Sequence, residues 1–162
     1  MRALVAGVGN VFLGDDGFGV AVARHLAATG VPEGVEVGDY GIRGIHLAYE
    51  LTSGYDLAIL VDAVPAGRAP GTLCVLEPAS PEPAPAFVDA HAMTPDAVLT
   101  LASGLDLPRG DRGGRVLLVG CEPADVSPGM DLSPPVAAAV PEAAGLVLEL
   151  IAKEFAEGER QW

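Results

Sequence analysis

The sequence is poor in cysteine, in aromatic residues and in basic residues. Only 2 of its 162 residues are cysteine, and no CxxC pair occurs, so a disulfide scaffold or a cysteine-rich metal site is not expected. Cys74 and Cys121 each lie in an apolar run, which predicts buried free thiols. Lysine and arginine number 9 against 22 acidic residues, for a formal charge of −13. This balance argues against binding nucleic acid or anionic membranes.

Long hydrophobic runs are also lacking, and none approaches the ~20 residues of a membrane-spanning helix. The first residues show no basic region, apolar core and small-residue cleavage site. Together with free thiols, these features predict a cytoplasmic protein. Half of the residues are hydrophobic, so we expect a folded chain, and residues 1–162 have the length of a single domain.

Strand-like and helix-like segments alternate along the chain. The apolar patterns predict strands near residues 3–6, 35–37, 57–61, 71–76 and 116–120, and helices near residues 18–29, 47–51, 94–101 and 133–155. This order predicts an α/β three-layer sandwich, with a central, twisted, mostly parallel mixed sheet of about five strands flanked by helices.

Two local features refine this expectation. The short link between the third and fourth predicted strands favours a hairpin, and therefore one antiparallel strand. Pro141 lies inside the last predicted helix, where the missing N–H is expected to kink or restart the helix.

A glycine-rich turn with two adjacent acids follows the first predicted strand. Gly7 and Gly9 allow a close backbone approach that a Cβ atom would block. Asp15 and Asp16 fall at a helix start, where unpaired N–H groups and the helix dipole favour carboxylates. One acid suffices for that role, so we expect the other carboxylate to face the space beyond the strand.

Acidic residues follow three of the predicted strands: Asp16, Asp39 and Asp62. Taken singly, each is an ordinary turn residue or helix cap. In open α/β sheets, however, ligands bind outside the carboxyl ends of the strands. Because parallel strands lie ~4.8 Å apart, carboxylates on neighbouring strands can converge on one ion.

The histidines differ in context. His25 and His46 lie on predicted helices and are expected at the surface. His91 lies in a loop just before a predicted helix, where its imidazole could join the carboxylates. Two carboxylates and one imidazole suit a borderline divalent metal such as nickel or zinc.

Other catalytic patterns are missing. The sequence contains no HExxH, GxSxG or GxxxxGK[ST] motif, which argues against three common hydrolase and nucleotide-binding classes. The run of residues 7–9 resembles the start of a dinucleotide fingerprint, but Phe12 stands in place of the third glycine. A small-nucleotide binder on a Rossmann-like sheet remains an alternative.

These motifs resemble those of the nickel–iron hydrogenase maturation endopeptidases. The resemblance rests on Gly7-x-Gly9-Asn10-x-x-Leu13-x-Asp15-Asp16-Gly17-x-Gly19, on Val61-Asp62-Ala63, on His91 before a leucine-containing helix, and less tightly on residues 39–44. It spans essentially the whole chain. It implies a twisted mixed sheet between helices, of the phosphorylase/hydrolase-like kind.

The resemblance also implies a function. Such proteins cut a C-terminal extension from the hydrogenase large-subunit precursor once nickel has been inserted. Asp16, Asp62 and His91 correspond to the family's metal-contacting residues, although the family often has glutamate in place of Asp16. Nickel would be carried by the substrate rather than bound tightly by the free protein, which we expect to be a monomer. The residues expected to contact the substrate chain are Asp39, Gly41, Ile42, Arg43 and Gly44. A non-catalytic nickel-binding escort protein is the alternative from a different class.

Overall fold

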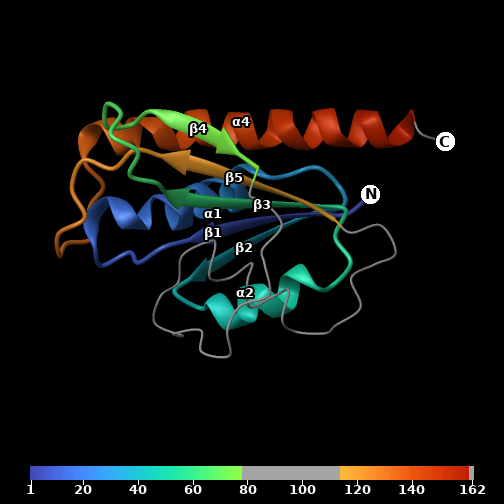
Figure 1. The fold of residues 1–162 in the computed structure, drawn as a ribbon, viewed down its shortest axis with the longest axis horizontal. Coiled ribbons are helices and arrows are strands. Elements are labelled where there is room, and N and C mark those ends of the chain that lie inside the picture. Colours follow the sequence, from blue (N-terminus) through green and yellow to red (C-terminus); the bar gives the residue numbers. More distant parts are fainter. Residues whose placement is uncertain (78–113, 161–162) are drawn as a thin grey trace.

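The chain folds into a mixed sheet with helices on its two faces (Figure 1). The structure, a computed structural model, describes residues 1–77 and 114–160. The helix predicted near residues 94–101 and His91 lie outside the described residues. The elements are β1 (Ala3–Val8), η1 (Gly14–Gly17), α1 (Phe18–Thr29), β2 (Val35–Gly41), α2 (Gly44–Leu51), β3 (Leu57–Ala63), β4 (Leu73–Leu76), β5 (Arg115–Cys121) and α4 (Pro134–Glu159).

Within the described residues, the sheet has five strands in the order β2-β1-β3-β5-β4. The pairs β1–β2, β1–β3 and β3–β5 are parallel, whereas β4 runs antiparallel to β5. The prediction of one antiparallel strand in a mostly parallel sheet is therefore confirmed. The predicted β3–β4 hairpin is wrong, because β1 and β5 occupy both edges of β3 and the link crosses the end of β5 instead.

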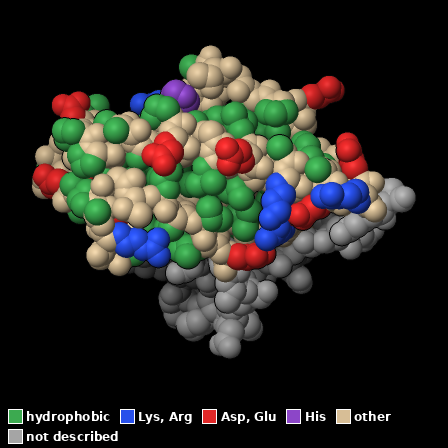
Figure 2. Space-filling view, turned by 90° about the horizontal axis from the view of Figure 1, so that it is seen from above, with side chains coloured by type: hydrophobic (Ala, Val, Ile, Leu, Met, Phe, Trp, Pro, Cys, Tyr) green, Lys and Arg blue, Asp and Glu red, His purple; other side chains and the backbone are tan. Residues whose placement is uncertain are grey.

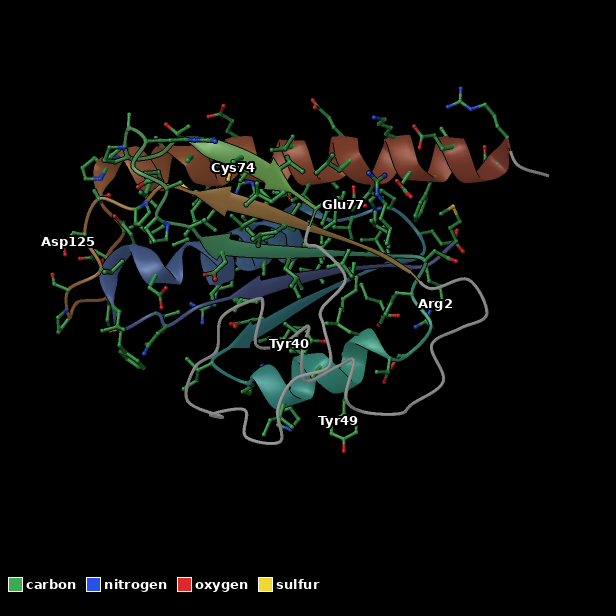
Figure 3. All side chains as sticks on the ribbon, in the orientation of Figure 1. Arg2, Tyr40, Tyr49, Cys74, Glu77 and Asp125 are labelled. Carbon is green, nitrogen blue, oxygen red and sulfur yellow. The ribbon has the colours of Figure 1, made fainter. Side chains whose placement is uncertain are left out.

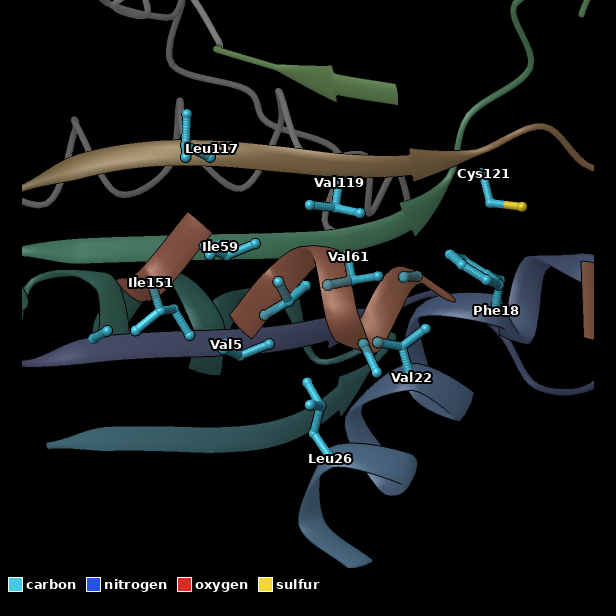
Figure 4. Packing of buried hydrophobic residues seen from close by; sticks show 14 of the residues in the cluster. Val5, Phe18, Val22, Leu26, Ile59, Val61, Leu117, Val119, Cys121 and Ile151 are labelled. Atoms are coloured by element: carbon cyan, nitrogen blue, oxygen red, sulfur yellow. The ribbon is translucent and has the colours of Figure 1, made fainter. Parts of the chain in front are cut away.

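Alternation along the strands separates two hydrophobic clusters, one on each face of the sheet. One face carries Val5, Ile59 and Val119, which pack with residues of α1 and α4 (Figure 4). The other face carries Leu4 and Leu60, which pack with residues of α2. Side chains of a strand point alternately to its two faces, so a continuous apolar run is buried on both. The predicted three-layer α/β fold is confirmed.

Helix α4 runs unbroken through Pro141, so the predicted restart does not occur. Both Pro141 and Ala137, whose carbonyl loses its helical partner, are on the exposed side, where water can satisfy that carbonyl. By length and composition alone, α4 could cross a membrane. The expectation that no apolar stretch approaches the length of a membrane-spanning helix was therefore too strict. Alanines on the outer side of α4 raise the hydropathy, and the face over α4 and β4 carries only scattered charges (Figure 2). Its inner side packs in the core through Val136, Ala139, Ala143, Ala144, Val147 and Ile151.

The two cysteines are free thiols, as predicted. Cys121 is buried in the core beside α4, whereas Cys74 on edge strand β4 is only partly buried. Cys74 is opposite Gly120 in the β4–β5 ladder, so the two thiols point to opposite faces of the sheet. Burial raises the pKa of Cys121 to about 11, which keeps this thiol protonated.

Glycine at position 19 allows α1 to lie directly on the sheet. A Cβ atom there would overlap the carbonyl oxygens of Val61 and Val8. We therefore expect Gly19→Ala to lower the free energy of unfolding by ~2 kcal/mol or more, since the backbone must shift to admit the methyl group. Urea unfolding measures this change.

Gly145→Ala provides the matched control. Gly145 lies inside α4, and beyond its chain neighbours and the backbone of its own helix no described atom lies within 4 Å of the position that a Cβ atom would take, so alanine should stabilise the helix by roughly 0.5–1 kcal/mol. Similar effects of the two substitutions would contradict the close contact at Gly19.

Candidate active site

The turn after β1 lies close to the carboxyl ends of the neighbouring strands β2 and β3. The Gly9 N–H donates to the Gly41 carbonyl at 3.0 Å, and Gly9 has φ +127°, a conformation that favours glycine. A Cβ atom at Gly9 would overlap the Asp16 carbonyl oxygen and lie 3.4 Å from Asp62 Oδ1. Glycine at this position therefore permits the turn carrying Asp16 to close over the strand ends beside Asp62.

Most backbone N–H groups of the turn donate to an acceptor within the protein. These are the N–H groups of Gly9, Asn10, Phe12, Leu13, Gly14, Asp15 and Asp16. Turns that bind phosphate leave such groups free to point at the ligand. Asp16 Oδ2 accepts the Asn10 N–H at 2.8 Å, so a carboxylate occupies the place a phosphate would need. The geometry argues against the nucleotide-binding alternative.

The adjacent acids of the turn have different environments. Asp15 is fully buried, and its carboxylate accepts N–H groups from Ala124, Asp125 and Ser133 and the Ser133 hydroxyl. Burial alone would raise the pKa of Asp15, but these hydrogen bonds outweigh it and hold the pKa below its usual value. Asp16 is only partly buried. The predicted division between a structural and an outward-facing acid agrees with this geometry, although Asp15 binds a distant loop rather than its own helix start.

Asp62 lies near the carboxyl end of β3, with only 7% of its surface exposed. Its Oδ1 accepts the N–H of the following residue, Ala63, at 2.8 Å. Burial and then the nearby charge of Asp16 raise the pKa of Asp62 to about 8. Within residues 1–77 and 114–160, no lysine, arginine or histidine forms an ion pair with Asp16 or Asp62. Two carboxylates that repel each other and have no such partner form a candidate cation-binding site.

Asp39 does not join this pair. In the strand register, Asp39 is the partner of Gly7 in β1, and Gly7 is the partner of Val61 in β3. The Asp39 side chain therefore points to the same face as Val61, the α1 face, and Asp62, the next residue of β3, points to the opposite face. On the α1 face, Asp39 pairs with Arg24 of α1 at 3.3 Å. The expectation that three carboxylates converge at this edge is therefore reduced to two.

The loop of residues 41–44 begins beside the acid pair, through the Gly41 contact with Gly9. Gly41 ends β2 with φ +51°, and Gly44 begins α2 and is buried. Arg43 folds back, and its guanidinium donates to the Asp39 carbonyl oxygen. Ile42 is 60% exposed, so its side chain is available to a partner.

The third predicted metal-contacting residue, His91, lies outside the described residues. In the part of the chain that the structure describes, no group of three His, Cys, Asp or Glu side chains could hold a metal ion. Asp16 and Asp62 are the two members of the predicted set that the structure places near each other.

Sequence reasoning overlooked Glu122, which follows β5. It is only 8% exposed, and its carboxylate accepts the N–H groups of Ala66 at 2.7 Å and Gly67 at 3.3 Å. It thereby holds the link that leaves β3 just after Asp62. Glu122 follows the apolar run of residues 116–120, so the signal that pointed to Asp62, an acid at the end of an apolar strand, applies to it as well.

The raised pKa of Asp62 predicts how stability depends on pH. In the unfolded chain this carboxyl ionises near its ordinary pKa of about 4, whereas in the folded chain it ionises near 8. Between these values the unfolded carboxyl is ionised and the folded one is protonated, so folding takes up a proton and stability falls as pH rises through that window. Asp62→Asn removes this penalty and should raise the free energy of unfolding by ~1 kcal/mol or more at pH 8, because each pKa unit is worth about 1.4 kcal/mol.

Urea unfolding at pH 5 and pH 8 measures the effect. The gain should be much smaller at pH 5, and the exposed Asp131→Asn should change stability little at either pH. An equal gain at the two values would show that burial does not raise the pKa of Asp62.

The chain matches known proteins along most of its length. The family model described as hydrogenase maturation protease matches residues 20–150. The hydrogenase 2 maturation protease of Escherichia coli is 32% identical over 161 residues, with 97% of this chain and 94% of the relative covered. The hydrogenase expression/formation protein HupD of Rhizobium leguminosarum bv. viciae is 33% identical over 146 residues, with 88% and 70% covered.

Solved structures show the same fold. The hydrogenase maturating endopeptidase HybD of Escherichia coli has a TM-score of 0.71 at 30% sequence identity, covering 94% of this chain and 93% of that one. A hydrogenase 2 maturation peptidase from a thaumarchaeote has a TM-score of 0.68 at 32% identity, covering 94% and 99%. On the match to the family model and to these relatives, the chain belongs to the hydrogenase maturation protease family and is an endopeptidase.

Proposed function

We propose that this protein removes the C-terminal extension of a nickel–iron hydrogenase large-subunit precursor after nickel has been inserted. The observation that supports this most directly is the Asp16–Asp62 pair, which lies at the carboxyl end of the sheet with no ion-pair partner among the described residues. Nickel belongs to the substrate. Asp16 and Asp62 would contact it, and the resemblance makes His91 the third ligand.

The chemistry of these groups suits nickel. Two carboxylate oxygens and an imidazole nitrogen form a mixed set that a borderline divalent ion accepts. A cation would displace the proton from Asp62 and cancel the repulsion between the two acids. Because an ion held by Asp16, Asp62 and His91 alone would lack the ligands that the precursor supplies, the free protein should bind nickel weakly.

The contribution of the chain to the reaction would be mainly positioning. Asp16 and Asp62 are attached to a closed turn and to a buried strand, so the nickel they contact would hold the scissile segment of the precursor in one place. Correct placement alone can supply a large part of a rate enhancement. Gly41 would let the substrate main chain approach closely, and Ile42 would offer an exposed side chain. Gly44, buried where α2 begins, and Arg43, folded back onto Asp39, would hold the shape of the loop. Asp39, paired with Arg24, would support this loop through the Arg43 contact with its carbonyl oxygen.

Residues 1–162 would form one protease domain that works as a monomer in the cytoplasm. The binding partner of this domain would be the hydrogenase precursor, and binding of nucleic acid or membrane is not expected. The strongly acidic balance, −13 at neutral pH, supports solubility and disfavours self-association.

The acid pair is tested by mass spectrometry of a nickel-loaded precursor incubated with the protein. Wild type should produce one C-terminal truncation, and only from the nickel-loaded precursor. Asp16→Asn and Asp62→Asn should each lower the processing rate by a factor of about 100 or more, since each removes a charged ligand. Asp131→Asn, at an exposed position in the loop before α4, is the control and should process normally.

Retained cleavage by Asp62→Asn would remove that residue from the mechanism. An intact, nickel-loaded precursor that wild type leaves uncut would contradict the protease function for that precursor. Calorimetric titration of the free protein with Ni²⁺ then tests the escort alternative, which requires tight binding without the precursor.

The substrate loop is tested separately with Ile42→Ala. Because this side chain is 60% exposed, its removal should leave the fold and kcat unchanged. Loss of its apolar contact with the precursor should raise KM about five-fold. Leu76→Ala, which removes an exposed leucine of β4, should change neither constant. An unchanged KM for Ile42→Ala would remove this side chain from the substrate contact.

A further inference from the structure

The turn that carries Asp16 is held against a loop from the far end of the chain. The Gly14 N–H donates to the Gly129 carbonyl at 2.8 Å, and the Asp15 N–H donates to the Asp125 carbonyl at 2.9 Å. In return, the Gly129 N–H donates to the Phe12 carbonyl at 2.9 Å. The loop between β5 and α4, in which Asp125 is labelled, lies at the end of the molecule toward which the parallel strands point (Figure 3).

The Asp15 side chain is the centre of this contact. It is 0% exposed, and its Oδ2 accepts the N–H groups of Ala124 at 2.8 Å and Asp125 at 3.0 Å. Ser133 adds its N–H to Oδ1 at 2.7 Å and its hydroxyl to Oδ2 at 2.8 Å. Hydrogen bonds to a charged acceptor are stronger than neutral ones, so one carboxylate fixes three residues of the loop.

Ser133 is used here in an unusual way. It is the N-cap residue of α4, yet its side chain caps no helical N–H group. The first helical positions are Pro134 and Pro135, which have no N–H to cap. Of the N–H groups that an N-cap side chain can reach, only that of Val136 at the third position remains. The Ser133 hydroxyl binds Asp15 instead, and the positive end of the helix dipole lies beside the same carboxylate.

The consequence reaches the next residue, Asp16. η1 is only four residues long, Gly14–Gly17, and Asp16 directly follows the clamped residue. Asp16 Oδ2 accepts the Asn10 N–H at 2.8 Å, and its carbonyl oxygen lies where a Cβ of Gly9 would be. The turn is thus anchored at Asp15 on one side of Asp16 and at Gly9 and Asn10 on the other. These contacts fix the position of the Asp16 carboxylate beside Asp62.

We propose that Asp15 is a positioning residue, which clamps the turn onto the β5–α4 loop and thereby sets where the Asp16 carboxylate meets the substrate. The inference rests on the proposed function for its effect on cleavage. Asp15 is not a catalytic residue, because its fully buried carboxylate cannot touch a precursor. Its action is through Asp16.

Ser133 provides a graded test that leaves both acids in place. Ser133→Ala removes one of the four hydrogen bonds to Asp15, and Ser133→Thr restores the hydroxyl. Asp15→Asn is the stronger change, because it replaces one of the two accepting oxygens with an NH2 group, a donor that would face the N–H donors of the loop. A misplacement of ~1 Å in a catalytic group costs about 10²-fold in rate, so we expect kcat to fall at least ten-fold in Asp15→Asn and less in Ser133→Ala, with KM little changed.

The amide of Asn10 reports on Asp16 without the precursor. Because it donates to Asp16 Oδ2, its ¹H–¹⁵N shift and its exchange protection should change in Asp15→Asn and Ser133→Ala and return in Ser133→Thr. Tyr55→Phe is the matched control. It removes hydrogen bonds to Glu36 and Glu50 from a residue that is only 6% exposed, just before β3 begins. It should lower stability and leave Asn10 and kcat unchanged.

Two outcomes overturn the inference. One is an unchanged Asn10 amide in folded Asp15→Asn, and the other is a shifted amide with normal cleavage, because Asp15 would then position a group the reaction does not need. Failure of the proposed function looks different, since wild type itself would leave the nickel-loaded precursor uncut. In that case Asn10 still decides whether Asp15 sets the place of Asp16.

Discussion

The site depends on one close backbone contact, the approach of the turn after β1 to the end of β3. Gly9 lies against the Asp16 carbonyl and near the Asp62 carboxylate, and Gly19 lets α1 rest on the carbonyls of β1 and β3. Side chains at either position would separate the turn from the sheet. The contact places two carboxylates together at the carboxyl end of a parallel sheet, where folds of this class bind ligands.

Three buried acids at this end of the sheet differ through their partners. Asp15 and Glu122 are surrounded by N–H donors, so each is a structural anion that ties a loop. Asp62 is nearly as buried, but among the described residues it accepts only the N–H of its neighbour Ala63, and Asp16 lies close enough to raise its pKa. The same side-chain chemistry therefore supports folding in one place and forms a candidate cation site in another. Hydrogen-bond donors decide which.

Much of the fold could be predicted because its signals are local. Continuous apolar strands and one helical apolar face predicted the layers, and their order predicted a mostly parallel sheet. The neighbour of β4 could not be predicted, because strand pairing depends on which sheet edge is open after all strands are placed. The ion pair of Asp39 with Arg24 could not be predicted for a similar reason, because Arg24 reaches Asp39 only when α1 packs on the sheet. Acids that follow parallel strands were expected at one edge, because these strands end on the same side of the sheet, and the structure places Asp16 and Asp62 near each other there; their role as a cation site stays a prediction.

By itself, the sequence determined the α/β class, the glycine-rich turn, the acids that follow the strands, and the family resemblance. These follow from residue type and spacing, which act over a few residues. Only the tertiary structure decided that Asp15 binds the loop before α4, that Asp39 forms an ion pair with α1, and that the Asp16 and Asp62 side chains lie near each other. The partners of those side chains are brought together by packing, up to 118 residues apart in the chain, and no local pattern encodes such a distance.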